Sequence, residues 1–364
     1  MAEIRNILLI RIRAFGDTLL TTPTLRGLKQ AYPGARLSVV LEPAMGEILK
    51  GLPYVDEIIP YDRLGMKKLG WWGELKANLR FNLWLRSRRF DLVLDVLGTP
   101  RTAWMTLFSG APRRVGFAFR VRRLAYNTVW HPAREPKYIA DFTADVLRAL
   151  GHQPDSLDLD FDVPGEARAR ADEFLRAQGL EGRRVVMASP AGGWELKRYP
   201  AAQLGRALDL IQKRSDARVL LLWGPGEREL AEEVAAGMDP APLLAPPTDL
   251  RLLAAFLQRA ALLVTNDGAN KHLAVATRTP TLTLFGPTSD LAWHPPADPR
   301  HRALKLALPC MPCEKLACRW GGLDKALPAG DPGRRAGVLL PQDCLRLLEP
   351  EKVAQAALEM LERP

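Results

Sequence analysis

Polar side chains that could handle a phosphorylated ligand end two apolar segments in the second half of the chain. The first segment stops at Ser189, with Gly192 and Gly193 shortly after it, and the second stops at Asp267, a few residues before His272. Glycine turns expose backbone amides, and amides at a helix start attract phosphate. We therefore expect both turns to bind the phosphate groups of a small molecule.

Two further charged residues follow apolar segments in this half. Lys197 adds a cation that can bind phosphate without a metal ion, unless it is a solvated lysine on a flexible loop. Glu227 follows the turn at residues 223–226, where a carboxylate can accept hydrogen bonds from both hydroxyls of a ribose. The alternative for Glu227 is an ordinary glutamate at a helix start.

In the first half, Asp17 is the matching candidate. It follows the apolar residues 7–12, with Gly16 just before it. A carboxylate in such a turn serves either as a helix N-cap or as a general base that accepts a proton from a reacting group. The turn has a single glycine, and the chain has no Walker-type phosphate loop. Nicotinamide-binding and ordinary P-loop chemistry are therefore disfavoured.

The elements that must position these side chains are alternating strands and helices. Apolar runs predict strands, and helical spacing predicts helices between them. The predicted strands are residues 7–12, 37–41, 57–60, 92–96, 184–188, 218–223, 262–265 and 281–285, and the predicted helices include residues 18–31, 138–150 and a segment after Arg101. This alternation predicts the α/β class, with two Rossmann-like doubly wound parallel-sheet domains and an interdomain cleft.

The chain of 364 residues is long enough for two domains. Its composition changes around residues 151–183. We predict an N-terminal domain at 1–165, a C-terminal domain at 166–349 with a cysteine-containing segment at 310–344, and a final helix at 350–364. Asp158, Asp160 and Asp162 alternate with apolar residues, which predicts one solvent face of an exposed strand in preference to a divalent-metal site.

The net charge of +10 indicates an anionic partner, which could be nucleic acid, phospholipid or a phosphorylated substrate. No recognisable nucleic-acid module accompanies the charge, so we expect no nucleic acid partner. The N-terminus leads directly into an apolar strand, and no apolar run approaches the ~20 residues that span a bilayer. We expect a cytoplasmic protein.

Two basic stretches bear on the partner. The first interleaves tryptophans with lysines and arginines, which favours peripheral contact with an anionic membrane surface and a phosphorylated glycolipid; the alternative is a solvated helix face. Its residues are Arg63, Lys67, Lys68, Trp71, Trp72, Lys76, Arg80, Trp84, Arg86, Arg88 and Arg89. The second stretch contains Arg113, Arg114, Arg120, Arg122 and Arg123.

The four cysteines form a third group. Cys310 and Cys313 have C-x2-C spacing, and Cys318 and Cys344 follow. In a reducing compartment this pattern argues against disulfides. It predicts a structural zinc or iron–sulfur site, with buried or redox-active thiols as the alternative.

An ordered set of motifs resembles the family 9 glycosyltransferases, the ADP-heptose:lipopolysaccharide heptosyltransferases. The motifs are residues 10–23, 95–98, 109–117, 197–200, 223–227, 265–272 and 284–288. They span nearly the whole chain in the expected order. The resemblance implies a GT-B fold and an inverting, metal-independent transfer of heptose from ADP-heptose to the phosphorylated lipid A and inner-core acceptor of lipopolysaccharide biosynthesis. It also implies peripheral association with the cytoplasmic face of the inner membrane and no cofactor for catalysis.

The resemblance assigns roles to particular residues. Asp17 corresponds to the general base, and Lys197 stabilises the departing ADP. The implied donor contacts are Ser189, Gly192, Gly193, Glu227, Asp267, Gly268, Ala269 and His272. We expect acceptor contacts from Gly16, Arg101 and Arg120.

One motif departs from the family pattern. The family more often has Ser or Thr followed by Gly after the aspartate, where this chain has Gly268 and Ala269. A hydroxyl contact to the donor is therefore missing, and backbone amides must take its place. Two alternatives stay open: a transferase that uses another nucleotide-sugar, and a nonenzymatic nucleotide- or glycolipid-binding protein with this fold.

Overall fold

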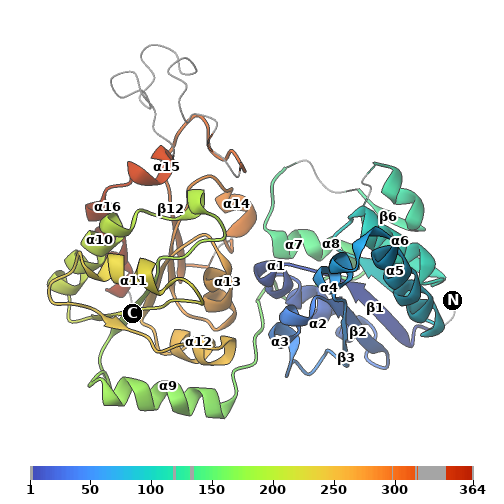
Figure 1. Cartoon of the computed structure of the whole chain (residues 1–364), viewed down its shortest axis with the longest axis horizontal. Coiled ribbons are helices and arrows are strands. Elements are labelled where there is room, and N and C mark those ends of the chain that lie inside the picture. Colours follow the sequence, from blue (N-terminus) through green and yellow to red (C-terminus); the bar gives the residue numbers. More distant parts are fainter. Residues whose placement is uncertain are drawn as a thin grey trace. The chain divides into compact units, whose positions relative to one another are not determined.

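The computed structural model describes residues 3–117, 120–131, 135–296, 298–315, 318 and 342–362. The chain divides into two compact units, unit 1 at Met1–Asp162 and unit 2 at Val163–Pro364 (Figure 1). Each unit contains one six-stranded sheet, and all paired strands are parallel. The predicted pair of doubly wound parallel sheets is confirmed.

In unit 1 the strand order is β3-β2-β1-β4-β5-β6. Its strands are β1 (Asn6–Ile10), β2 (Arg36–Leu41), β3 (Glu57–Pro60), β4 (Leu92–Asp95), β5 (Arg113–Phe117) and β6 (Thr128–Trp130). Its helices are α1 (Phe15–Leu19), α2 (Thr22–Ala31), η1 (Pro43–Met45), α3 (Gly46–Leu49), α4 (Arg63–Lys68), α5 (Gly70–Ser87), α6 (Pro100–Phe108), η2 (Arg120–Ala125), α7 (Ile139–Thr143) and α8 (Asp145–Arg148).

The chain order of the strands reverses between β1 and β4. In β1 every residue after Asn6 is buried, as expected for a central parallel strand covered on both faces. The last residues of the two strands, Ile10 and Asp95, pair in register. Ligands of doubly wound sheets bind outside the carboxyl ends of strands at this switch point. The turns that follow β1 and β4 are therefore the expected place for a site in unit 1.

The predicted single helix at residues 18–31 is wrong, because the segment forms α1 and α2 with a break between them. Pro23 has no N–H to donate to the carbonyl of Leu19, so a continuous helix would leave that carbonyl unpaired. The Thr22 hydroxyl donates to the Leu19 carbonyl instead, at 2.7 Å. Pro23 then stands in the first turn of α2, where a missing N–H costs nothing.

In unit 2 the order is β12-β11-β10-β7-β8-β9, which is the same topology as in unit 1. Its strands are β7 (Val185–Ser189), β8 (Arg218–Leu221), β9 (Leu243–Leu244), β10 (Leu262–Asn266), β11 (Thr281–Leu284) and β12 (His301–Leu304). Its helices are α9 (Gly165–Ala177), η3 (Glu195–Lys197), α10 (Ala201–Arg214), α11 (Arg228–Ala235), α12 (Leu250–Leu257), α13 (Ala269–Ala276), α14 (Asp290–Trp293), α15 (Asp343–Arg346) and α16 (Pro350–Leu361).

Helix α16 packs against α10 and contributes to the core of unit 2. Val353, Ala354 and Ala357 on its inner face are fully buried in the same cluster as Leu208 and Ile211 of α10.

The prediction of an exposed strand through Asp158, Asp160 and Asp162 is wrong, since the segment pairs with no strand. Arg26 of α2 forms an ion pair with Asp160 and hydrogen-bonds the carbonyl of Asp158. The Tyr54 hydroxyl also donates to Asp160, at 2.8 Å. The Asp160 side chain thus ties the end of unit 1 to α2 and to Tyr54.

Candidate functional site

Asp267 lies at the switch point of the sheet in unit 2. It follows Asn266, the last residue of β10, and the neighbouring Thr265 pairs in register with Ser189 at the end of β7. These are the two adjacent strands between which the strand order reverses. The sequence-predicted Ser189 and Asp267 are therefore brought to one edge of the sheet, where doubly wound folds bind ligands.

Two lysines and a threonine hold the carboxylate of Asp267. Lys197 Nζ lies 2.7 Å from Oδ2, and Lys271 Nζ lies 2.6 Å from Oδ1. The Thr288 hydroxyl donates to Oδ2 at 2.7 Å. Lys271 also donates to the carbonyl of Trp293 at 2.7 Å. The side chains of Asp267, Lys197, Lys271 and Thr288 are all buried.

This cluster carries a surplus of positive charge. Burial alone would raise the pKa of Asp267, but the charges of Lys271 and Lys197 outweigh it and hold that pKa far below its usual range. Burial lowers the pKa of Lys271, and the ion pair with Asp267 opposes this shift. Two ammonium groups against one carboxylate leave one positive charge among buried side chains. Such a charge favours an anionic ligand.

His272 is buried beside this cluster and is neutral. Burial and then the charge of Lys271 lower the pKa of His272 well below 6.5. Its Nδ1 is enclosed and has no hydrogen-bond partner within the described part of the chain. Its ring lies edge-on to Trp293 at 6.2 Å between centroids. His272 therefore adds no positive charge to those of Lys197 and Lys271. Its position suits a packing role in the turn.

The two glycine turns face each other across the edge of the sheet. A Cβ on Gly268 would lie 4.0 Å from the Cα of Gly192, so the two backbones run close together. The Asn270 side chain donates to the Ser189 hydroxyl at 2.8 Å, and the Asn266 side chain donates to the carbonyl of Pro190 at 2.8 Å. Neighbouring polar side chains therefore fix both turns without occupying the amides of Gly192 and Gly268.

The amides at the start of α13 point to the same edge. Gly268 is the N-cap residue of this helix, and Ala269 is its first residue. No side chain in the described part of the chain caps the helix start. The unpaired N–H groups and the partial positive charge of the helix end are suited to bind phosphate.

Lys197 stands beside two aromatic rings. Its Nζ lies 4.1 Å from the ring centroid of Trp194 and 5.7 Å from that of Trp293. Cation–π contacts and the ion pair to Asp267 hold the ammonium in place. The alternative of a solvated lysine is wrong, because only 8% of the residue is exposed.

Glu227 follows the turn after β8 and is the N-cap residue of α11. Its Oε2 accepts from the N–H of Gly224 at 2.9 Å. The carboxylate thus closes its own turn, as the helix-start alternative requires. The side chain is only half-buried, and its remaining lone pairs can accept hydrogen bonds from the hydroxyl groups of a ligand. Both readings of this residue remain consistent with its position.

In unit 1, Asp17 lies in α1 directly after Gly16 and forms an ion pair with a buried arginine. Arg11 Nη2 lies 2.6 Å from Asp17 Oδ1, and the N–H of Ala14 donates to Oδ2 at 3.3 Å. Arg11 also donates to the carbonyl of Val96 at 3.2 Å. A quarter of the Asp17 side chain is exposed. The carboxylate therefore has a fixed orientation and is accessible to a ligand.

The turn after β4 is organised by Asp95, which is fully buried. Its Oδ1 accepts from the N–H groups of Leu97 and Gly98 at 2.9 and 2.8 Å, and its Oδ2 accepts from the Tyr126 hydroxyl at 2.7 Å. A Cβ on Gly116 would lie 2.5 Å from the Tyr126 ring, so glycine is needed for this approach. Burial raises the pKa of Asp95, although these hydrogen bonds oppose the shift.

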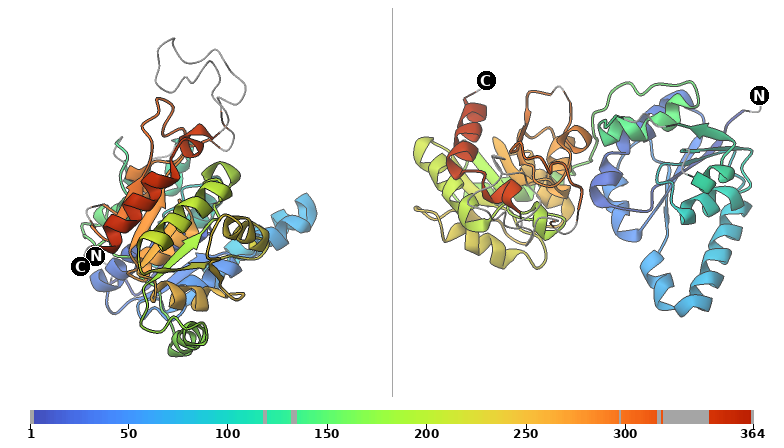
Figure 2. Two further views of the ribbon diagram at one scale, coloured as in Figure 1. Left: turned by 90° about the vertical axis from the view of Figure 1, so that its left-hand side faces the viewer. Right: turned by 90° about the horizontal axis from the view of Figure 1, so that it is seen from above.

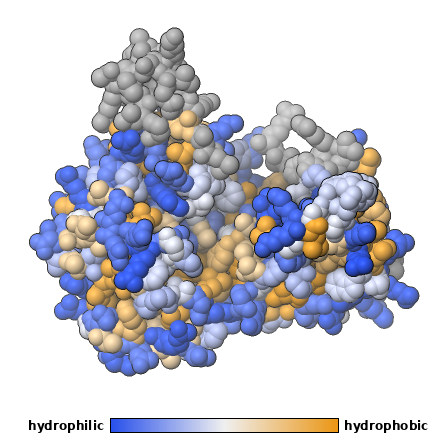
Figure 3. Space-filling view, viewed as in Figure 1, coloured by the Kyte–Doolittle hydropathy of each residue, from blue (hydrophilic) through white to orange (hydrophobic). Residues whose placement is uncertain are grey.

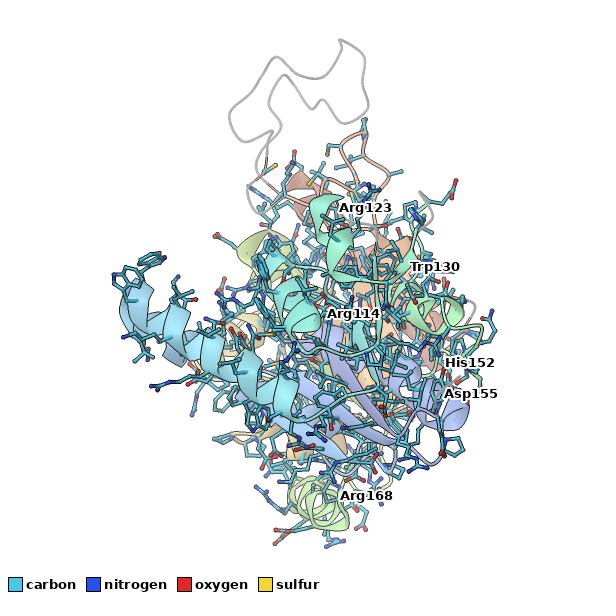
Figure 4. The ribbon with its side chains drawn as sticks, turned by 90° about the vertical axis from the view of Figure 1, so that its right-hand side faces the viewer. Arg114, Arg123, Trp130, His152, Asp155 and Arg168 are labelled. Carbon is cyan, nitrogen blue, oxygen red and sulfur yellow. The ribbon has the colours of Figure 1, made fainter. Side chains whose placement is uncertain are left out.

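Of the predicted acceptor residues, Arg101 and Arg120 belong to different helical segments, and the acceptor role of Gly16, Arg101 and Arg120 stays a prediction. Arg101 stands in the first turn of α6 and pairs with Glu74 of α5 at 2.6 Å. Arg120 is the first residue of η2, and its side chain lies outside the described residues. In the second basic stretch, Arg114, which is labelled in Figure 4, lies beside η2. Its side chain donates to the carbonyls of Ala111 and Ala125. These contacts support the loop around η2.

The cysteine hypothesis stays a prediction. Among the described residues no group of three or more His, Cys, Asp or Glu side chains is arranged to hold a metal ion. Burial, and then the proximity of Cys310, Cys313 and Cys318, raise the pKa of the Cys344 thiol to about 12. The four cysteines are thus close enough for their thiols to interact.

Three site residues were not predicted from the sequence. Arg11 could have been found, because an arginine inside an apolar strand needs a buried partner. Lys271 could have been found from its i, i+4 spacing to Asp267 on a helix. Thr288 had no such signal, since it comes to Asp267 from the turn after β11.

Comparison with known proteins identifies relatives over the whole chain. The family model of glycosyltransferase family 9 (heptosyltransferase) matches residues 79–323. Lipopolysaccharide heptosyltransferase 1 of Pseudomonas aeruginosa is 29% identical, with 99% of each chain covered. The family 9 glycosyltransferase of Veillonella parvula has a TM-score of 0.79 at 22% identity, over 99% of this chain and 98% of that one. The Escherichia coli ADP-heptose lipopolysaccharide heptosyltransferase II has a TM-score of 0.72 at 20% identity, over 98% of both chains.

Proposed function

Because the chain belongs to glycosyltransferase family 9, the heptosyltransferase family, we propose that it transfers a heptose from ADP-heptose to a sugar hydroxyl of the phosphorylated lipid A and inner-core acceptor. The fold is that of a GT-B glycosyltransferase. The observation that carries the proposal is the surplus positive charge at Lys197, Asp267 and Lys271, beside two glycine turns at the sheet's switch point. A nucleoside diphosphate supplies the missing negative charge.

The donor would bind through its diphosphate. Lys197 and the amides at Gly192, Gly268 and Ala269 are the groups available to bind the phosphate oxygens. As the bond between the anomeric carbon and the phosphate oxygen breaks, negative charge grows on the departing ADP. Cations and amides that are already in place stabilise that charge without rearranging. The transfer therefore needs no metal ion. Glu227 would accept hydrogen bonds from the ribose hydroxyls.

Asp17 would act as the general base. The acceptor hydroxyl oxygen attacks the anomeric carbon as its proton passes to the carboxylate of Asp17, and ADP leaves from the opposite side. A single displacement of this kind inverts the configuration of the anomeric carbon. The ion pair with Arg11 supports this role, because it fixes the orientation of the carboxylate that must receive the proton.

We also propose that the enzyme works on the cytoplasmic face of the inner membrane as a peripheral protein. No described helix is long and apolar enough to cross a bilayer. The first basic stretch carries exposed Trp71 and Trp72 together with lysines and arginines. Interfacial tryptophans and cations are the features that hold peripheral proteins to anionic membranes.

The motif departure at Gly268 and Ala269 favours a second candidate, a transferase that uses another nucleotide-sugar. Both oxygens of Asp267 are already engaged by protein groups, and the side chains of the two following residues carry no hydroxyl. Fewer polar side chains are then available to select the donor sugar.

One assay tests both candidates. ADP release from ADP-heptose is measured with defined lipid A and core acceptors, and UDP- and GDP-sugars are run in parallel. We expect release from ADP-heptose that depends on the acceptor. Faster turnover with another nucleotide-sugar would establish the second candidate. Nucleotide binding with no turnover of any donor would leave a nonenzymatic binding protein.

A further inference from the structure

Helix α5 is largely without a protein partner. Leu85 is the only buried residue among its 18 residues. The segment of α4 and α5 projects from the rest of unit 1 (Figure 2), and its side chains extend outward along its length (Figure 4). The exposed large apolar side chains of this segment and of the neighbouring α6 are Leu64, Leu69, Trp71, Trp72, Leu75, Leu79, Leu83, Trp84, Trp104, Leu107 and Phe108. Apolar and hydrophilic surface lie side by side over unit 1 (Figure 3).

A groove of about 590 Å³ runs between α5 and α6. Its apolar walls are Trp71, Leu75 and Leu79 on α5 and Trp104, Met105 and Phe108 on α6. The Trp104 and Phe108 rings stack at 5.4 Å between centroids, which makes one wall continuous. The volume is within the roughly 300–1,000 Å³ of small-molecule sites. The groove can therefore take a hydrocarbon chain.

Several polar residues that line the groove are already bonded within the protein. Glu74 pairs with Arg101, and the Asn78 side chain donates to the Glu74 carbonyl at 2.7 Å. Asn78 also accepts a hydrogen bond from the Tyr61 hydroxyl. These bonds leave the apolar walls as the main surface offered to a ligand.

The charges around the groove determine which apolar partner fits. Residues 63–89 contain eight lysines and arginines and one glutamate. In the described part of the chain no carboxylate pairs with Lys67, Lys68, Lys76, Arg80, Arg86 or Arg89. A second copy of the chain would bring the same positive charge and be repelled. An anionic lipid complements both the charge and the apolar walls.

Two of these cations are placed to receive a headgroup. Lys76 and Arg80 are four residues apart on α5, so they lie one turn apart on the same side of the helix. Leu75 and Leu79, which line the groove, immediately precede them, so Lys76 and Arg80 lie about 100° further round the helix, on its exposed face beside the groove. Their long side chains can extend back toward the edge of the groove and meet the phosphate of a lipid whose chain enters it.

We propose that the groove between α5 and α6 binds one acyl chain of an anionic membrane phospholipid, with the lipid phosphate against Lys76 and Arg80. The inference rests on the membrane contact of the proposed function and is independent of the transfer reaction. It makes the contact a defined lipid site, in addition to general attraction to a charged surface. The bound lipid would hold the α4–α5 segment at the membrane.

Short-chain lipids that stay monomeric separate this site from binding to a bilayer surface. Calorimetric titration of the full chain with dihexanoylphosphatidylglycerol should show saturable binding of one lipid, and dihexanoylphosphatidylcholine should bind more weakly. Leu79→Asn and Phe108→Asn change half-exposed wall residues and should each weaken phosphatidylglycerol binding by about tenfold or more. Leu291→Asn, at an exposed leucine in unit 2, is the matched control and should bind like the unchanged protein.

The headgroup is tested by the double variant Lys76→Gln, Arg80→Gln, which should remove the preference for phosphatidylglycerol. Equal binding by the wall variants and the unchanged protein would overturn the proposal, as would equal binding of the two lipids. A concentration-dependent dimer that Leu79→Asn dissociates in sedimentation experiments would assign the groove to a second copy and also overturn it.

A transfer assay with a deacylated, water-soluble acceptor keeps this proposal separate from the proposed function. Leu79→Asn should leave that reaction unchanged. If the unchanged protein binds the lipid but releases no ADP from any donor, the proposed function fails and the lipid site stands. If it transfers heptose but the groove variants have no effect on lipid binding, the lipid site fails alone.

Discussion

Lys271 follows Asp267 by four residues, and its Nζ lies 2.6 Å from Oδ1 of Asp267. Both side chains are almost completely buried. This pair leaves the other carboxylate oxygen to Lys197 and Thr288. Lys271 has no exposed surface, so it cannot readily reach a ligand. Its charge instead balances Asp267, and the charge of Lys197 is then available to a phosphate.

We predict that Lys271→Met destabilises the protein. Removing one partner of a buried pair leaves a buried carboxylate with less compensation, and we expect the free energy of unfolding to fall by about 3 kcal/mol. Urea unfolding of the full chain measures the change. Lys213→Met is the matched control, because Lys213 pairs with Asp209 at the same spacing but is half-exposed, and its loss should cost less than about 1 kcal/mol. Equal effects would contradict a special role for the buried pair.

Lys197→Ala should weaken ADP binding and slow transfer together. A charge-assisted contact to phosphate is worth about 1.5–3 kcal/mol, which corresponds to a roughly 10- to 100-fold change in affinity. Calorimetric titration with ADP and the initial rate of ADP release from ADP-heptose report the two effects. Lys352→Ala, on the exposed side of α16, should change neither. An unaltered ADP affinity in Lys197→Ala would remove this residue from the phosphate site.

Asp17→Asn should lower the rate of transfer by about 10²- to 10⁴-fold and leave ADP affinity unchanged, since a general base contributes roughly that factor. Asp62→Ala tests the alternative of a simple helix cap. Asp62 caps α4 through Oδ1, which accepts from the N–H of Gly65 at 2.8 Å. This control should lose about 1 kcal/mol of stability and keep its activity. If the two variants behave alike, Asp17 is a cap and not a base.

Acid should destabilise unit 2 before its carboxylates are protonated. Burial lowers the pKa of His301 from 6.5 to about 4, although Asp298 opposes the shift. Between these values the unfolded chain binds more protons than the folded one, so stability is complete above pH ~6.5 and falls as the pH drops. From pH 7 to pH 5 this histidine alone should remove about 2 kcal/mol.

The burial-driven shifts of His272 and His294 are in the same direction. Urea unfolding at a series of pH values measures the slope. His301→Gln should flatten it, and an unchanged slope in this variant would contradict the assignment to His301.

The arrangement of strands could be predicted from the sequence because apolar runs and the turns between them are local signals. Glu57–Pro60 and Thr281–Leu284 form strands at or within one residue of the predicted positions. The position of Asp267 at a strand end also followed from its own neighbours. Parallel strands bring the residues at their carboxyl ends together at one edge of the sheet. It could therefore be predicted that the turn after Ser189 and the turn at Asp267 lie side by side.

Other features depend on contacts between distant segments. The break between α1 and α2 follows from one proline, but a leucine pattern that runs through it predicts a single helix. The alternation of Asp158 and Asp160 is that of a strand, yet the segment pairs with none of the described strands and Arg26 pairs with Asp160 instead. Thr288 reaches Asp267 only because β11 lies beside β10.

The two units share one strand topology, and the chain passes from the first to the second only once, at Asp162 and Val163. A single genetic crossover at that point would exchange a whole sheet with its switch-point residues and would cut through neither hydrophobic core. Descendants of such a protein could therefore inherit Asp17 and the α5–α6 groove from one parent and the Asp267 cluster from another. Acceptor preference and donor preference would then evolve as separately inherited characters.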